Sequence, residues 1–150
     1  MTERDIEFKV FRYKQGGAAP AYQTFRTRCD ENTTVLVALQ DIRRDLDGTL
    51  IMRHSCHHAS CGTCGMRING REELACVVKV FDLNTATVVV EPMRNMPVIS
   101  DLVVDMGPFY DRFNSAGMPL MRESEYLDGA DVAEGLEAYM RCENCIECNL

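Results

Sequence analysis

Hydrophobic and polar residues alternate in two stretches near the start of the chain. Residues 6–14 read IEFKVFRYK and residues 22–28 read YQTFRTR. Alternation of this kind is typical of strands that bury one face. The intervening QGGAAP has the glycine and proline content of a loop. The pattern therefore predicts an opening β-hairpin.

A helical pattern follows the hairpin. Four apolar residues share the spacing i, i+4, i+7 and i+11 of one helical face: Val35, Leu39, Ile42 and Leu46. Thr33 or Thr34 can cap the start of this helix, and Gly48 marks its end. We expect a helix that faces the core.

Two further patterns complete the first part of the chain. MRINGREELAC contains two short extended stretches around Asn69-Gly70, a strong hairpin signal. ATVVVEP predicts a last strand that stops at Pro92. Strands, one helix, a long loop and more strands predict an α+β domain over about residues 5–98.

Beyond Pro97 the pattern becomes helical. Leu102, Met106, Phe109 and Phe113 fall on one helical side, although Gly107-Pro108 can break or kink such a helix. VAEGLEAYM repeats the spacing with three more apolar residues: Val132, Leu136 and Tyr139. Residues 99–150 thus carry helical spacing and differ in pattern from the strand-rich residues 5–98.

Composition and charge restrict the possible functions. The 150 residues are 46% hydrophobic and 26% charged, which is typical of a globular protein. A net charge of −7, with 16 scattered basic residues, argues against nucleic-acid binding. MTERDIEFKV lacks the apolar region of a signal peptide, and the apolar runs are too short to span a membrane. We expect any membrane attachment to come through a partner.

The eight cysteines carry the strongest chemical signal. In a chain without an export signal, grouped cysteines more often bind metal or do redox work than form disulfides. Seven fall into two groups: Cys56, Cys61, Cys64 and Cys76, then Cys142, Cys145 and Cys148. Cys29 stands apart, and we expect it to be a small buried hydrophobic residue and no ligand.

The first group has the spacing Cys56-x4-Cys61-x2-Cys64-x11-Cys76. A disulfide framework would need an oxidising compartment. A thioredoxin-like pair would use only the central C-x2-C, and zinc ribbons usually have two such pairs. C-x4-C-x2-C with a later cysteine instead matches plant-type [2Fe–2S] proteins. The spacing therefore favours a [2Fe–2S] cluster over zinc.

Other residues of this loop fit the same interpretation. Gly62 and Gly65 lack a Cβ atom, so the backbone can approach a cluster closely and reach positive φ. His57 and His58 could suggest a Rieske centre, but four cysteines already complete the ligand set. We expect both histidines to lie on the surface of the loop.

The second group, Cys142-x2-Cys145-x2-Cys148, matches the first three positions of the C-x2-C-x2-C-x3-C-P run that holds [4Fe–4S] clusters. The next cysteine would be due at position 152. A zinc half-site or a chance group is the alternative. Beside a ferredoxin loop, we interpret the triplet as part of a second cluster site.

Three segments together resemble one family. RHSCHHASCGTCGMRINGREELAC is similar to the [2Fe–2S] signature of the iron–sulfur subunits of succinate dehydrogenases and fumarate reductases. PVISDLVVDMGPFYDRF resembles the segment between that family's two domains, and YMRCENCIECNL the entry to its second domain. The resemblance covers essentially the whole chain.

The resemblance implies a β-grasp [2Fe–2S] ferredoxin-type domain followed by the beginning of an α-helical ferredoxin-like domain. It implies that Cys56, Cys61, Cys64 and Cys76 bind [2Fe–2S]. It also implies that Cys142, Cys145 and Cys148 are three of four [4Fe–4S] ligands. The last [4Fe–4S] ligand and the [3Fe–4S] cysteines of the family have no counterpart among these residues, so we expect a stable second cluster to need further chain.

The implied function is electron transfer, with no substrate chemistry on this chain. Single electrons would pass between a flavoprotein subunit carrying FAD and a quinone at membrane anchor subunits, on the cytoplasmic side of the inner membrane. Two alternatives remain open. One is a stand-alone [2Fe–2S] ferredoxin, and the other is a sibling complex such as a thiol-coupled fumarate reductase.

Overall fold

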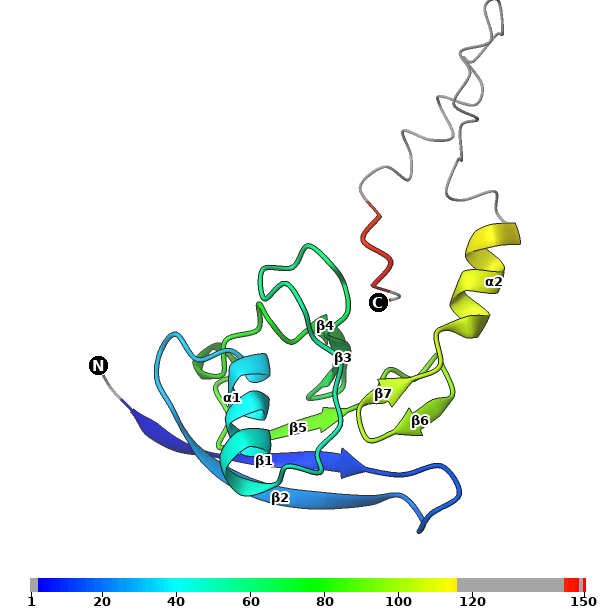
Figure 1. Cartoon of the computed structure of the whole chain (residues 1–150). Helices are drawn as coiled ribbons and strands as arrows, with labels where there is room; N and C mark the ends of the chain where they lie inside the picture. The colour runs from blue at the N-terminus through cyan, green and yellow to red at the C-terminus, as the bar shows by residue number, and fades with distance from the viewer. Residues whose placement is uncertain (1–2, 116–144, 149) are drawn as a thin grey trace, which may run out of the picture. The chain divides into compact units, whose positions relative to one another are not determined.

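The computed structural model describes residues 3–115, 145–148 and 150. The chain divides into two compact units, Met1–Asp105 with Glu147–Leu150, and Met106–Ile146. The first unit holds a five-stranded sheet: β1 (Arg4–Arg12), β2 (Ala21–Cys29), β3 (Gly65–Ile68), β4 (Arg71–Leu74) and β5 (Thr87–Glu91). It also holds α1 (Val35–Asp41), a π-helical turn η1 (Ile42–Leu46), a 3₁₀ turn η2 (Phe81–Leu83), and the two-stranded β6 (Val98–Ser100) and β7 (Val103–Val104) (Figure 1).

The sheet is mixed, in the order β2-β1-β5-β3-β4. β1 pairs antiparallel with β2 and parallel with β5, and β3 pairs antiparallel with both β4 and β5. In this register Phe8 lies opposite Phe25 on one side and Val88 on the other. The predicted opening hairpin and the predicted strand before Pro92 are both confirmed.

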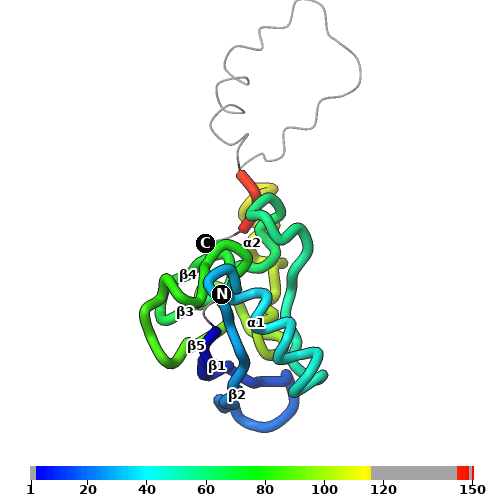
Figure 2. The backbone as a smooth tube through the Cα atoms, turned by 90° about the vertical axis from the view of Figure 1, so that its left-hand side faces the viewer, coloured from blue at the N-terminus to red at the C-terminus, as the bar shows by residue number. Residues whose placement is uncertain are grey.

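One face of the sheet is buried under α1 (Figures 1 and 2). Along β1, Ile6, Phe8 and Val10 are buried, while the residues between them are more exposed. Apolar side chains of α1 and of the loops complete the core, including Leu36, Leu39, Leu50, Met66 and Val80. A mixed sheet with a helix packed across one face is the β-grasp arrangement, so the α+β prediction is confirmed.

Helix α1 begins where the sequence predicts, but its apolar face is shorter than expected. The Thr34 hydroxyl accepts a hydrogen bond from the amide of Val37 at 3.3 Å and caps the helix. Leu46 is 55% exposed, so its assignment to the buried face is wrong. The amide of Asp47 donates to the Ile42 carbonyl at 2.9 Å, an i→i+5 bond that widens the last turn and rotates Leu46 away from the core.

The turn between β3 and β4 is the predicted Asn69-Gly70 hairpin. Asn69 has φ 47° and Gly70 has φ 88°. Two successive positive φ angles define the turn type that matches the twist of a two-residue hairpin. Asn69 also accepts a hydrogen bond from the amide of Val89 at 2.8 Å, which ties the turn to β5.

The predicted helix around Leu102 begins later than expected. Leu102 is buried in the first unit and Val103–Val104 form β7, so these residues are extended. In the second unit, α2 spans Gly107–Ser115, and Gly107-Pro108 start this helix. Proline fits a first helical turn because the amide it lacks has no intrahelical partner there.

Within α2, the rings of Phe109 and Phe113 stack with centroids 5.7 Å apart. Both residues therefore lie on one side of the helix, as the spacing predicts. The helix predicted around Val132, Leu136 and Tyr139 lies outside the described residues. In the described part of the chain, no helix is long and apolar enough to cross a bilayer.

Candidate metal centre

Three cysteines of the first group, Cys56, Cys61 and Cys64, lie in an irregular loop between Met52 and the start of β3, and Cys76 follows β4 (Figure 1). Three residues of this loop have positive φ: His57 at 63°, Ala59 at 60° and Gly62 at 68°. Left-handed residues reverse the direction of the backbone over short distances, so the loop curls on itself. The prediction that Gly62 supplies a positive φ is confirmed.

Hydrogen-bond and electrostatic interactions connect the thiols of this group with one another, Cys64 with Cys61 included. The Cys61 thiol interacts with Cys56, and the Cys64 thiol interacts with Cys76, which follows β4. Cys56 and Cys61 are partly exposed, whereas Cys64 and Cys76 are buried. Cys56 and Cys61 therefore form an outer pair toward solvent, and Cys64 and Cys76 form an inner pair against the core.

Backbone amides point at two of the sulfurs. The amides of His58 and Ser60 lie 3.4 Å and 3.3 Å from the Sγ of Cys56. The amide of Ala59 lies 3.3 Å from the Sγ of Cys76. Hydrogen bonds from amides to ligand sulfurs stabilise negative charge there and are one determinant of iron–sulfur reduction potentials.

A side chain supplies a further contact. The Thr63 hydroxyl lies 3.1 Å from the Sγ of Cys61. This contact, with backbone and side-chain hydrogen bonds around the thiol, lowers the pKa of Cys61 to about 6. Burial raises the pKa of Cys64 to about 11. The lowered pKa favours the thiolate form of Cys61 at neutral pH, whereas burial keeps the Cys64 thiol protonated.

The donor set fits a [2Fe–2S] cluster. Thiolates are the usual protein ligands of such clusters, and two thiols are available for each of two irons. Amides directed at the sulfurs are what a cluster site needs from its surrounding loop. Among the residues that the structure describes, no group of three or more His, Cys, Asp or Glu side chains is arranged around a single ion.

The remaining residues near the first group lie where the sequence predicts. His57 and His58 are exposed, and the rings of His54 and His57 contact each other edge to face, with centroids 5.6 Å apart. Cys29 is only 1% exposed and packs in the core, and burial raises its pKa to about 11.

The second cysteine group is only partly described. Cys142 lies outside the described residues, Cys145 is exposed, and Cys148 is partly buried. A Cβ atom on Gly65 would lie 3.1 Å from the carbonyl oxygen of Cys148 and 3.3 Å from Cδ2 of Leu150. Gly65 has no positive φ. Its missing Cβ therefore makes room for the segment around Cys148.

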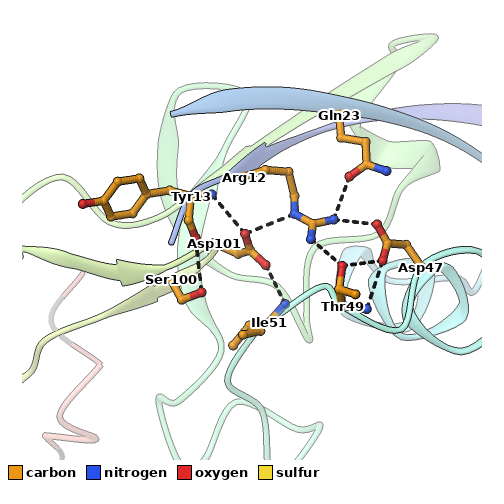
Figure 3. Close-up of polar contacts among 8 residues, drawn as sticks. All are labelled: Arg12, Tyr13, Gln23, Asp47, Thr49, Ile51, Ser100 and Asp101. Carbon is orange, nitrogen blue, oxygen red and sulfur yellow. Dashed lines mark hydrogen bonds and ion pairs between the residues drawn. The ribbon is translucent and has the colours of Figure 1, made fainter. Parts of the chain in front are cut away.

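Sequence patterns did not identify every residue that supports the loop. Thr63 lies inside the C-x2-C motif, and this position could have identified its hydroxyl as a hydrogen-bond partner of a cysteine sulfur. Arg12 and Asp101 are 89 positions apart and meet only in the folded chain, with Arg12 Nε 3.1 Å from a carboxylate oxygen of Asp101 (Figure 3). No periodicity or motif marks that pair.

Comparisons with curated proteins show relatives along nearly the whole chain. It is 36% identical to the fumarate reductase iron-sulfur subunit of Mycobacterium tuberculosis, over 95% of this chain and 61% of that protein. It is 30% identical to the mitochondrial succinate dehydrogenase [ubiquinone] iron-sulfur subunit of Candida glabrata, over 95% of this chain and 58% of the relative. The Dictyostelium discoideum counterpart is 33% identical over 96% of this chain and 54% of its own length. The chain thus spans less than two thirds of these relatives.

A solved structure has the same fold. The Mycobacterium smegmatis Sdh1 complex in the apo form contains a chain that matches 98% of this one, with a TM-score of 0.77 and 24% identity, and 62% of that chain is covered. The family model described as a 2Fe-2S iron-sulfur cluster binding domain matches residues 7–111. That match extends over more than half of the sequence and includes the complete first cysteine group. The chain therefore belongs to the family of 2Fe-2S iron-sulfur cluster binding domains.

Proposed function

We propose that this chain is an electron-transfer iron–sulfur subunit of a succinate dehydrogenase or fumarate reductase complex. In that role it relays single electrons between a flavoprotein subunit with FAD and a quinone at membrane anchor subunits. The relatives named above support the subunit class. The observation that carries the proposal is the loop in which two thiol pairs receive hydrogen bonds from neighbouring amides.

Cys56, Cys61, Cys64 and Cys76 are the proposed ligands of the [2Fe–2S] cluster. When bound, the cluster supplies one-electron redox chemistry. Cys56 accepts two amide hydrogen bonds and Cys61 contacts the Thr63 hydroxyl, so added negative charge is best stabilised beside this outer pair. The buried inner pair, Cys64 and Cys76, fixes the loop against the core.

Cys142, Cys145 and Cys148 are proposed as part of a [4Fe–4S] site. A [3Fe–4S] site would belong to a longer chain of the family's kind. We further propose that the protein associates peripherally with the cytoplasmic side of the inner membrane through its partners. A sibling complex with a different acceptor would use the same ligands on this chain, so the acceptor must be identified on the partner subunits.

Metal and sulfide analysis of anaerobically purified protein tests the cluster assignment. We expect at least two irons and two acid-labile sulfides per chain, with a [2Fe–2S] visible spectrum and an electron paramagnetic resonance (EPR) signal after one-electron reduction. Cys64→Ser should weaken or shift the cluster, because oxygen is a harder ligand than thiolate. Zinc without labile sulfide would contradict the assignment.

The partner assignment needs a separate experiment. We expect the cluster-loaded chain to bind the flavoprotein subunit and to be reduced when succinate is added to that subunit. A ferredoxin that works alone would show neither behaviour while still carrying its cluster. Loss of succinate-dependent reduction in Cys61→Ser, with flavoprotein binding retained, would connect the electron path to the proposed ligand set.

A further inference from the structure

Arg12, the last residue of β1, is the centre of a polar cluster of side chains (Figure 3). Its Nε donates to Asp101 at 3.1 Å, and its Nη1 donates to Asp47 at 2.8 Å and to Gln23 at 2.7 Å. Its Nη2 donates to the Thr49 hydroxyl at 2.8 Å. All three nitrogens of one guanidinium are therefore engaged, and the contacted residues come from three segments: β2, residues 47–49 and the turn at Asp101.

Asp101 is the buried member of the cluster, with 4% of its surface exposed. Besides Arg12, its carboxylate accepts hydrogen bonds from the amides of Tyr13 at 3.0 Å and Ile51 at 2.9 Å. Asp101 has φ 44°, in the left-handed region that a non-glycine residue adopts at a cost. Such a conformation persists when the surrounding contacts determine it, as these three donors do.

The polar side chains around Arg12 and Asp101 hold the chain just upstream of the first cysteine group. The Ile51 amide donates to Asp101, and the Ile51 carbonyl accepts from the amide of Leu102 at 3.2 Å. Arg12 contacts Asp47 and Thr49 of the same segment. Hydrogen bonds from Thr49, followed by that from Arg12, lower the pKa of Asp47, so its carboxylate stays ionised at neutral pH.

We propose that Arg12 and Asp101 are positioning residues for the iron–sulfur loop. They fix the backbone at Ile51, five residues before Cys56, and thereby fix the point from which the loop approaches its metal. This inference rests on the proposed function, because it assumes the [2Fe–2S] ligand set above. Both residues act through the backbone at Ile51, and the side-chain partners described above include no cysteine of that set.

The physical reason is conformational entropy, because a loop whose upstream end is not anchored has many conformations. The loop contains Cys56, Cys61 and Cys64, and its downstream end continues directly into β3. An anchored upstream end reduces the conformations over which three thiolates must be gathered. Charge-assisted hydrogen bonds suit this purpose because they are roughly twice as strong as neutral ones.

Asp101→Asn in the full chain tests the proposal. The new amide group turns one acceptor into a donor, which must face an amide or the guanidinium. We expect hydrogen exchange at the Ile51 amide to accelerate about tenfold or more, since a lost hydrogen bond to a charged group is on that scale. We also expect the [2Fe–2S] absorbance to decay at least several-fold faster with a ferrous chelator, together with a changed EPR line shape.

Glu91→Gln is the matched control. Glu91 forms a half-buried ion pair with Arg67 at 3.3 Å, between β5 and β3, and accepts a hydrogen bond from the Tyr22 hydroxyl; neither Ile51 nor Asp101 is among these partners. The chemical change is the same carboxylate-to-amide replacement. Chelation kinetics and EPR spectra should therefore stay close to the parent values in this variant. Arg12→Lys is a milder second variant, because one ammonium cannot bridge the four acceptors.

The outcomes separate the two proposals. A parent chain that binds no [2Fe–2S] cluster overturns the proposed function and this inference with it. A parent chain with the cluster, and Asp101→Asn with unchanged chelation rate and EPR spectrum, overturns the inference alone, even if exchange at Ile51 accelerates. Equal cluster loss in Glu91→Gln overturns it too. If Asp101→Asn fails to fold, the chelation rate and EPR spectrum of Arg12→Lys test the inference instead. Values like those of the parent in that variant would overturn it.

Discussion

The Thr63 hydroxyl is a single side-chain group that can change the reduction potential of the proposed centre. It lies 3.1 Å from the Sγ of Cys61 and is the first cause of the lowered pKa of that thiol. A donor that stabilises the thiolate stabilises the reduced, more negative cluster for the same reason. The residue therefore contributes through electrostatics and does not need to ligate iron.

Thr63→Val should lower the midpoint potential of the cluster. A net hydrogen-bond contribution of about 1 kcal/mol corresponds to a shift on the order of tens of millivolts for one electron. Redox titration followed by EPR would measure it. Thr63→Ser retains the hydroxyl and should keep the parent potential, and an unchanged potential in Thr63→Val would show that the contact has no electronic effect.

Cys29 is buried in the core, and we predict that it is not a ligand of the proposed centre. Burial raises its pKa to about 11, so it should resist alkylation at pH 8 in the folded protein. Since its folded pKa lies above the unfolded value, its contribution to stability is complete below pH 8.5 or so and falls as pH rises toward about 11. Cys29→Ala should leave the visible spectrum of the cluster unchanged, and loss of that spectrum in a folded variant would make Cys29 a ligand.

At the scale of an element, the β3–β4 hairpin depends on its turn. Gly70→Val places a β-branched residue at φ 88°, where side chains are disfavoured, and should lower the free energy of unfolding by about 1–2 kcal/mol. The cluster spectrum should persist, because the turn lies at the far end of β3 from Cys64.

Urea denaturation of the loaded protein measures this loss. Gly48→Ala is the matched control: Gly48 has no positive φ, and a Cβ there would meet only the Arg43 carbonyl at an ordinary 3.8 Å. We expect its stability to stay within about 0.5 kcal/mol of the parent. Equal losses in the two variants would argue against a conformational role for Gly70.

For the whole molecule, cluster and fold should stabilise each other. The loop curls through three left-handed residues, and several of its hydrogen bonds end on cysteine sulfur, so it has little to hold its shape without metal. The sheet and α1 have their own apolar core, which includes Phe8, Leu36 and Val88. We therefore expect the chain without its cluster to keep the sheet and lose the order of the loop.

Removal of the cluster should lower the melting temperature by roughly 10 °C. A ligand bound only to the folded state stabilises by mass action, and ~2 kcal/mol shifts a domain of this size by about that amount. Far-UV circular dichroism before the transition should be nearly unchanged. Identical melting curves with and without cluster, or loss of the sheet on removal, would contradict this division between core and loop.

The sequence alone determined the features that depend on local spacing. Period-two alternation predicted β1 and β2, Asn69-Gly70 predicted the second hairpin, and Thr34 was correctly expected as a possible cap. The cysteine spacing predicted the [2Fe–2S] family, because three of the four proposed ligands lie in one short loop and must follow a fixed order along the chain. These signals are readable because their causes lie within a few residues of each other.

Only the tertiary structure decided the features that join distant segments. The π-turn places Leu46 outward, and of the helical pattern from Leu102 to Phe113 only the part from Gly107-Pro108 onward forms a helix, while Leu102 is buried and β7 is extended. Arg12 and Asp101 acquire their roles through contacts across 89 positions. Alternation can assign a residue to a face of a strand, but partners at such separations are selected by packing and hydrogen bonding of the folded chain, which no local pattern encodes.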